Sequence, residues 1–194
     1  MEVTLALSKY AYVLQKVYWF AYLQILWILF TMIGFVFFGI FPATHALFTV
    51  LKDQKELSSG EAFRKFHGAF TISFLKINKA AIIWQPMYTI ISLNLFIISS
   101  DYLFIRVMVT GMLGLILLSM IHFLQYFEVE KPILSQIKRA FSLVFLLPKH
   151  NAGYMCVFVL LLLAIAFIPG ITFFFGMSLA VFFIVKIGGP KENE

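Results

Sequence analysis

The stretch VFFGIFPATHALFTVLK, from Val36 to Lys52, decides how this chain is arranged. It continues a long apolar segment, contains Pro42, and has no charged residue before Lys52. Proline removes a backbone donor and disfavours helix in the residue before it, so Pro42 marks a break. Two arrangements are open: one membrane crossing that overruns, or two crossings with a turn at the proline.

The composition of the 194 residues is that of a membrane protein. Hydrophobic residues make up 62% and charged residues 12%, whereas soluble domains are about half apolar and a quarter charged. We therefore expect an all-α, polytopic helical membrane protein, with residues 1–194 as a single integral membrane domain. Basic loops explain the net charge of +6 without nucleic acid, and the single Cys156 excludes an intrachain disulfide.

Two segments have the length of a single crossing. A bilayer core about 30 Å thick needs roughly 20 helical residues. Ala80–Ser100 and Val107–Phe127 fit this length, and a short connection joins them.

The two outer apolar segments, Val17–Leu51 and Ala152–Val185, are too long for one crossing and short for two. They contain 35 and 34 uncharged residues, and each corresponds to roughly 50 Å of straight helix. A proline near a glycine interrupts each segment, and glycine permits a tight turn. We interpret both segments as hairpins, with the turn residues Gly39, Pro42, Pro169 and Gly170.

Lysine and arginine favour hairpins over single crossings. With hairpins, the chain has six membrane segments and cytoplasmic termini, and 14 of its 15 basic residues face the cytoplasm; with single crossings the count is 10. Because cytoplasmic loops are enriched in basic residues, we expect six segments, arranged as three hairpins joined by two cytoplasmic interfacial helices. The second segment, Ala43–Leu51, is too short to span alone, so it either extends past Lys52 or is a half-span shielded by protein.

The two interfacial helices are predicted from two basic connections. Apolar residues recur at helical spacing from Phe63 to Phe74 and from Ile133 to Val144. Basic residues lie off these apolar faces, where they can meet anionic lipid headgroups or a partner protein. The predicted contact residues are Arg64, Lys65, Lys138 and Arg139.

The segment Leu26–Lys52, and above all FGIFPAT from Phe38 to Thr44, resembles the signature of the YesL-like family of bacterial integral membrane proteins. The connection GEAFRKFHGAFTISFLKINKAAI, Gly60–Ile82, resembles the next block of that family. The resemblance implies the bacterial cell membrane and a genomic association with carbohydrate uptake, typically beside ATP-driven sugar importers. The family is a domain of unknown function, so it supplies no catalytic or binding residues.

Residues suited to chemistry are few. No Asp, Glu, Lys or Arg lies deep in the long apolar segments, which argues against proton-coupled transport. His45 and His122 lie near segment ends, where a hydrogen-bonded structural role is the commoner one, and amides inside spans mostly bond between helices. Phosphate-binding loops, paired metal ligands and nucleophile elbows are missing from the sequence, so we expect no catalytic, cofactor-binding or metal-binding residues. The amides are Gln24, Gln85, Asn94 and Gln125.

We therefore expect a non-enzymatic membrane protein that is accessory to carbohydrate uptake and associates with a sugar-import complex. The alternative is a small transporter or permease subunit for a sugar or a related solute. Each sugar hydroxyl stripped of water needs a partner, and the apolar segments offer few. The stretch Gln136–Pro148 has the location of an importer coupling helix but lacks the Glu-Ala-Ala and Gly pattern of that loop, so we interpret it as a membrane-surface connector.

Overall fold

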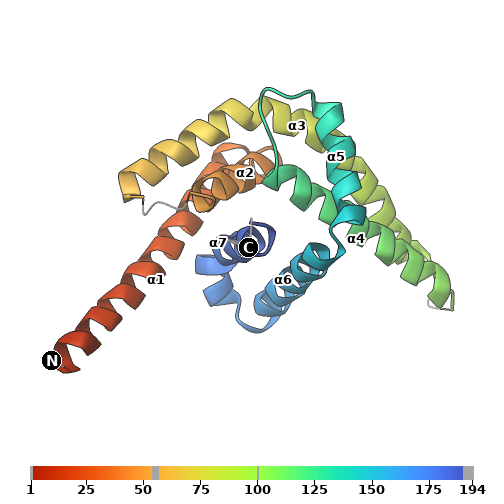
Figure 1. The fold of residues 1–194 in the computed structure, drawn as a ribbon. Helices are drawn as coiled ribbons and strands as arrows, with labels where there is room; N and C mark the ends of the chain where they lie inside the picture. Colours follow the sequence, from red (N-terminus) through yellow and green to blue (C-terminus); the bar gives the residue numbers. More distant parts are fainter. Residues whose placement is uncertain (1, 54–56, 100, 190–194) are drawn as a thin grey trace.

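The computed structural model describes residues 2–53, 57–99 and 101–189, with the side chains of 2–9 and of residue 95 left out. All regular structure within these ranges is helical, which confirms the all-α prediction. The helices run in the order α1 (Glu2–Ile33), α2 (Ile40–Leu51), α3 (Ser59–Ile97), α4 (Leu103–Gln125), α5 (Ile133–Leu146), α6 (Pro148–Phe167) and α7 (Pro169–Gly188), and Figure 1 shows their arrangement.

Four segments of the described chain are long and apolar enough to cross a membrane. They are Tyr10–Ile33 in α1, α4, α6 and α7. The six predicted segments are not confirmed, because the second of them is α2, a helix of 12 residues, and the third, Ala80–Ser100, falls in the second half of α3 and is not among these four. At about 1.5 Å per residue, α2 is roughly 18 Å long, far short of a bilayer core.

The first turn lies earlier in the chain than predicted. The turn spans residues 34–39, Gly39 is the N-cap of α2, and Pro42 lies inside the first turn of that helix. Pro42 is tolerated there because the first N–H groups of a helix have no intrahelical acceptor. We expected the returning helix to begin at Pro42, but it begins directly after Gly39.

This turn is closed by two glycines in backbone contact. A side chain on Gly34 would collide with the backbone of Gly39, and one on Gly39 with the backbone of Thr31. Phe35 and Val36 have φ of 55° and 62°, a conformation that is rare for a β-branched residue and costs about 1–3 kcal/mol. The four residues between the glycines, 35–38, are all exposed and apolar.

The first basic connection and the following span form one helix instead of two. The 39 residues of α3 begin at a capping box, in which the Ser58 side chain accepts from the Glu61 N–H and the Glu61 side chain accepts from the Ser58 N–H. Figure 1 shows that α3 changes direction between its first and second halves. The amphipathic first half packs on α1 and α2, with Phe66 fully buried and its ring centroid 5.1 Å from that of Phe30.

The second predicted interfacial helix has the expected limits. Pro132 is the N-cap of α5, and Pro148 is the first residue of α6. Gln136, Ile137, Ala140 and Val144 form the buried face of α5. Pro169 likewise begins α7 immediately after α6, so the predicted turn at Pro169 and Gly170 is where the structure has it.

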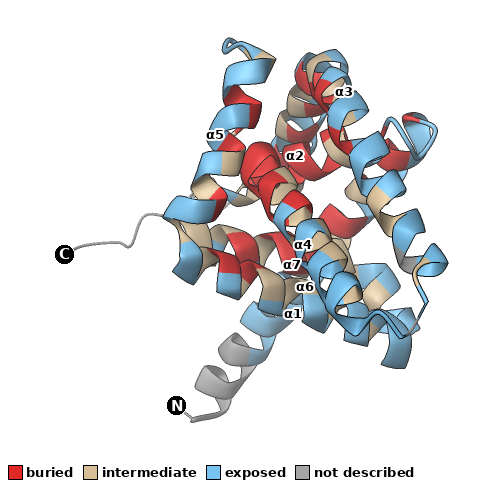
Figure 2. Cartoon of the chain, turned by 90° about the vertical axis from the view of Figure 1, so that its right-hand side faces the viewer, coloured by how far each residue is buried: buried red, intermediate tan, exposed pale blue. Residues whose placement is uncertain are grey.

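The hydrophobic core is centred on α2. Eight of its 12 residues are buried, and it contacts α1, α3, α4 and α7. Figure 2 shows buried residues concentrated on α2 and on the helix faces around it, while the far ends of α3, α4 and α6 are exposed. The short apolar helix is therefore shielded by protein on most sides.

Candidate functional site: a polar layer at the end of α4

Polar side chains from four helices and two connections gather at the C-terminal end of α4. We call this group the polar layer; its members are His45, Lys52, His122, Gln125, Tyr126, Gln136, Asn151 and Tyr154. The N-terminus of α6 and the C-terminus of α7 lie at the same end, because Tyr154 bonds to Gln125 and Tyr126 bonds to Gly188.

The turn between α1 and α2 is bonded to the middle of α3. The Asn78 amide donates to the Phe38 carbonyl at 3.0 Å. Two other residues of α3 bond α4 or the connection after it. Lys76 donates to the Val129 carbonyl, and Trp84 donates to Ser119 at 3.0 Å. The Pro169 turn lies about 28 Å from Gly188 along α7, at the opposite end. α1 packs antiparallel to α7, with Gln24 bonded to Ser178 and Phe20 beside Phe182, so the C-terminus of α1 points toward the N-terminus of α7. The side of the membrane that each turn faces stays a prediction.

Side chains of α2 cap the C-terminus of α4. The last four carbonyls of a helix have no intrahelical donor. His45 Nδ1 donates to the Leu124 carbonyl at 3.0 Å, and Lys52 Nζ donates to the Gln125 carbonyl. A cation at a helix C-terminus also interacts favourably with the helix dipole. Burial lowers the pKa of the Lys52 ammonium from its ordinary value.

Two tyrosines join α4 to α6 and α7. The Tyr154 hydroxyl donates to Gln125 Oε1 at 2.8 Å, and the Tyr126 hydroxyl donates to the Gly188 carbonyl at 3.1 Å. Any side chain at position 188 would meet the Tyr154 hydroxyl and the Gln125 amide, so these two groups would have to move. Burial raises the pKa of Tyr126, which keeps its hydroxyl a donor.

The ring of Tyr126 also holds two cations. Lys52 Nζ lies 5.0 Å from its centroid, and the Arg139 guanidinium lies 5.7 Å away. Cation–π contacts of this kind contribute about 0.5–2 kcal/mol. Tyr126 therefore connects α2, α5 and α7 at a single residue.

His122 and Asn151 form a buried pair between α4 and α6. His122 Nε2 donates to Asn151 Oδ1 at 2.7 Å, and the Asn151 amide donates to the Val144 carbonyl in α5. His122 is fully buried, and its Nδ1 has no hydrogen-bond partner within the described part of the chain. This pair fixes three helices relative to one another.

Gln136 organises the connection between α4 and α5. Its Oε1 accepts from the Glu128 N–H at 2.8 Å, and its Nε2 donates to the carbonyls of Glu128 and Lys131, each at 2.9 Å. The Glu128 carboxylate pairs with Lys131 at 2.7 Å and with Arg139 at 3.3 Å. The hydrogen bond from Lys131 is the main reason that the pKa of Glu128 is lowered.

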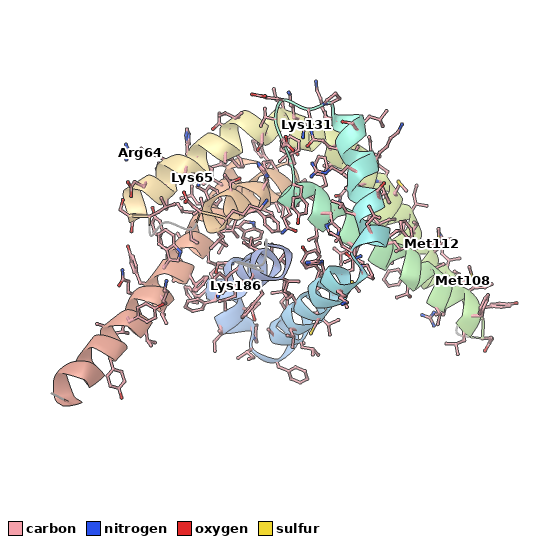
Figure 3. All side chains as sticks on the ribbon, viewed as in Figure 1. Arg64, Lys65, Met108, Met112, Lys131 and Lys186 are labelled. Atoms are coloured by element: carbon pink, nitrogen blue, oxygen red, sulfur yellow. The ribbon has the colours of Figure 1, made fainter. Side chains whose placement is uncertain are left out.

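The four predicted contact residues differ in their surroundings. Lys65 pairs with Asp53 at 2.6 Å, and Arg139 is held by Glu128 and Tyr126. Arg64 and Lys138 are exposed. Figure 3 shows Arg64 and Lys65 on the first half of α3, Lys131 near the start of α5, and Met108 and Met112 in the first half of α4. Lys131 and Arg139 lie beside the polar layer, because both pair with Glu128.

Open space around the polar layer is small. One cavity of about 10 Å³ is lined by residues that include His122, Tyr126, Gln136 and Arg139. A second of the same volume lies between α2, α3 and α4, with an almost wholly apolar lining. A volume of 10 Å³ is close to the minimum for one water molecule. In residues 2–53, 57–99 and 101–189, no group of three or more His, Cys, Asp or Glu side chains is placed to hold a metal ion.

The remaining interior polar groups are engaged in helix packing. The Gln24 Oε1 accepts from the Ser178 N–H at 3.0 Å, and the Trp27 indole donates to the Thr44 hydroxyl at 3.0 Å. Of the amides noted in the sequence, Gln24 and Gln125 join helices, Asn94 bonds its own backbone, and Gln85 is exposed.

Sequence reasoning missed the polar layer as a unit. Gln136, Tyr126 and Asn151 lie outside or at the ends of the apolar segments, where polar residues are ordinary. Their common signal is that each falls within a few residues of a proline or a helix end, where free backbone groups need partners. That signal indicates where polar groups are needed but does not indicate which helices they join.

Comparison with known proteins identifies relatives but no function. Residues 20–95 match the family described as "Protein of unknown function, DUF624". The "Uncharacterized protein YteU" of Bacillus subtilis is 25% identical over 175 residues, which cover 87% of this chain and 78% of that protein. The "Uncharacterized protein YesL" of the same organism is 58% identical over 33 residues, 17% of this chain and 16% of that protein. No solved structure gives a significant match.

Proposed function

Because the chain belongs to the YesL-like family of unknown function, DUF624, we propose that it is a non-enzymatic membrane protein that acts through contacts with lipid and other proteins. In this proposal the helical bundle is a scaffold, and its basic end is the surface that partners recognise. The alternative, a transporter or permease subunit, requires a solute path through the bundle.

The observation that carries the proposal is the use of the interior polar groups. His45, Gln125, Asn151 and Tyr154 are bound to other parts of the same chain at hydrogen-bond distances. A sugar would have to replace several of these bonds, at about 1–3 kcal/mol for each group left unpaired. Cavities of about 10 Å³ are also far below the roughly 300 Å³ of small-molecule pockets.

The distribution of charge supports an orientation in the bacterial cell membrane. The first half of α3 carries Arg64 and Lys65, α5 and the connection before it carry Lys131, Lys138 and Arg139, and the first turn of α4 has only Arg106. Cytoplasmic loops carry the excess of Lys and Arg, so the polar layer faces the cytoplasm in this proposal. Lys186 near the end of α7 supports the same orientation.

The partner we propose is a sugar-import complex. This part of the proposal rests on the family resemblance, and the exposed Arg64 and Lys138 supply a surface for an acidic partner or for anionic headgroups. The two surfaces lie on different helices, α3 and α5, so a partner that touches both is held at two points.

Reconstitution into vesicles tests the proposal. The purified chain alone should give no saturable uptake of labelled sugars, while affinity capture from the native membrane should recover subunits of a sugar importer. An Arg64→Glu, Lys138→Glu double variant should reduce this recovery, and Lys16→Glu, remote from both surfaces, should not. Saturable uptake by the isolated chain would contradict the scaffold proposal and favour the transporter.

A further inference from the structure

The second half of α3 and the first half of α4 form a projecting pair of helices. Figure 1 shows them extending away from α6 and α7 at the right of the molecule. Along residues 85–90 and 103–105, every side chain is exposed. Trp84 donates to Ser119, which lies six residues before the end of α4. Residue 85 is therefore about 9 Å from the level of the polar layer, measured along α4. Because α4 has the length of a span, this part of α3 lies at hydrocarbon depth.

Pro86 leaves a backbone acceptor free at this depth. It lies inside α3 and has no N–H, so the Ile82 carbonyl loses the hydrogen bond that residue 86 would normally donate. Ile82 is 66% exposed and therefore lies on the outer face of the helix. Freed backbone groups within a membrane need a new partner, because hydrocarbon offers none.

Gln85 presents a free donor beside this acceptor. Its side chain is exposed and makes no hydrogen bond with any described residue, whereas Asn78 and Asn94 in the same helix bond carbonyls of their own backbone. Residues 82 and 85 are three apart, so they are neighbours on the helix surface and differ in height by about 4.5 Å. Helical side chains lean toward the N-terminus, which brings the Gln85 amide toward the level of the Ile82 carbonyl.

We propose that two copies of this chain associate through this face of α3, with the Gln85 amide of each copy donating to the Ile82 carbonyl of the other. Donor and acceptor lie on one face of one helix, so the surface is self-complementary, as a two-fold interface requires. The two copies have the same orientation across the membrane, and the α3 helices run in parallel. Each hydrogen bond then satisfies one polar group that lipid leaves unpaired.

Energy transfer between copies labelled at the native, exposed Cys156 tests this in vesicles of defined protein-to-lipid ratio. The native chain should show reversible dimers. Gln85→Leu removes the donor, and Pro86→Ala supplies the Ile82 carbonyl with an intrahelical N–H. Each should raise the dissociation constant about tenfold or more. Asn94→Leu is the matched control, because that amide already bonds the Ile90 carbonyl, and it should leave the dissociation constant unchanged.

Crosslinking locates the interface independently. In a Cys156→Ala background, Thr89→Cys lies one turn from Gln85 on the exposed face and should form an intermolecular disulfide under mild oxidation. Leu163→Cys, on the exposed side of α6, should not. A chain that stays monomeric at every density overturns the proposal, as does a Gln85→Leu variant that dimerises like the native chain. Crosslinking through α6 in place of α3 would also contradict it.

Discussion

The two outer apolar segments of this chain share one sequence pattern but fold differently. Both are uncharged runs of about 35 residues interrupted by a proline near a glycine, and both were predicted as hairpins that cross the membrane twice. In the second, α6 and α7 are antiparallel helices of 20 residues each, with the turn at the far end. In the first, the 12-residue α2 is too short to span, and the side chains of His45 and the adjoining Lys52 bond the end of α4.

The difference follows from the polar residues that each half carries. In α2, His45 and the adjoining Lys52 bond carbonyls at the end of α4, and Thr44 accepts from Trp27 in α1. In α6 the polar residues cluster at the polar layer, and the stretch between residues 155 and 171 has none. A proline therefore permits a turn, and the partners available to nearby polar groups determine where the returning helix goes.

The largest effect expected is a difference in the labelling of the two turns. In a Cys156→Ala background, Gly170→Cys should react with a membrane-impermeant thiol reagent in intact cells, because that position is exposed and has room for a side chain. Phe35→Cys, 84% exposed, should not react in intact cells, because the 12 residues of α2 are too short to carry this turn across the hydrocarbon core. Ser142→Cys in α5 is the control that reacts only after permeabilisation. Reaction of Phe35→Cys in intact cells would support the original prediction that both outer segments are hairpins that cross the membrane twice.

Gln136→Leu should be the most destabilising single change in the polar layer. It removes three hydrogen bonds to the backbone of the connection after α4, and buried backbone groups left unpaired cost about 1–3 kcal/mol each. Partial access of water to the connection reduces the sum to about 3 kcal/mol. Denaturant unfolding in micelles measures it, and Gln136→Glu, which keeps the acceptor, should cost less. Equal losses for both variants would contradict this account of Gln136.

His45→Leu sharpens the comparison between α2 and α7. It leaves the Leu124 carbonyl without a donor and should lower the free energy of unfolding by about 2 kcal/mol. Thr172→Val in α7 is the matched control, since that hydroxyl only bonds the Ile168 carbonyl one turn before it, and it should change stability by less than about 0.5 kcal/mol. Similar losses in both helices would mean that α2 is not held by the end of α4.

The smallest effect is a loosening of the α4–α5 connection in acid. The pKa of Glu128 is lowered by its hydrogen bond from Lys131, so its contribution is present above the unfolded value of about 4.3. The contribution is lost as the pH falls through the folded value. Amide exchange over residues 128–139, corrected for its intrinsic pH dependence, should rise below about pH 4. Glu128→Gln should remove this pH dependence, and an unchanged acid response in that variant would assign it elsewhere.

The sequence was sufficient to predict those features that depend on the residues of a single helix. Apolar length predicted the spans in α4, α6 and α7. Helical spacing of apolar residues predicted α5, but its buried face holds Gln136 and Ala140 beside Ile137 and Val144. The predicted turn at Pro169 agrees with the structure. The exceptions were Pro42, which lies two residues inside α2, and the segment predicted to begin at Ala80, a residue inside the single helix α3.

The sequence by itself thus determined the class of protein, the apolar helices and the basic face, because burial in lipid and the start of a helix depend on nearby residues. Only the tertiary structure decided the course of α2 and the membership of the polar layer. His45 and Leu124 are 79 residues apart, and Tyr126 and Gly188 are 62 apart. A free carbonyl at the end of a helix requires some donor, but which donor reaches it depends on how all the helices pack at once.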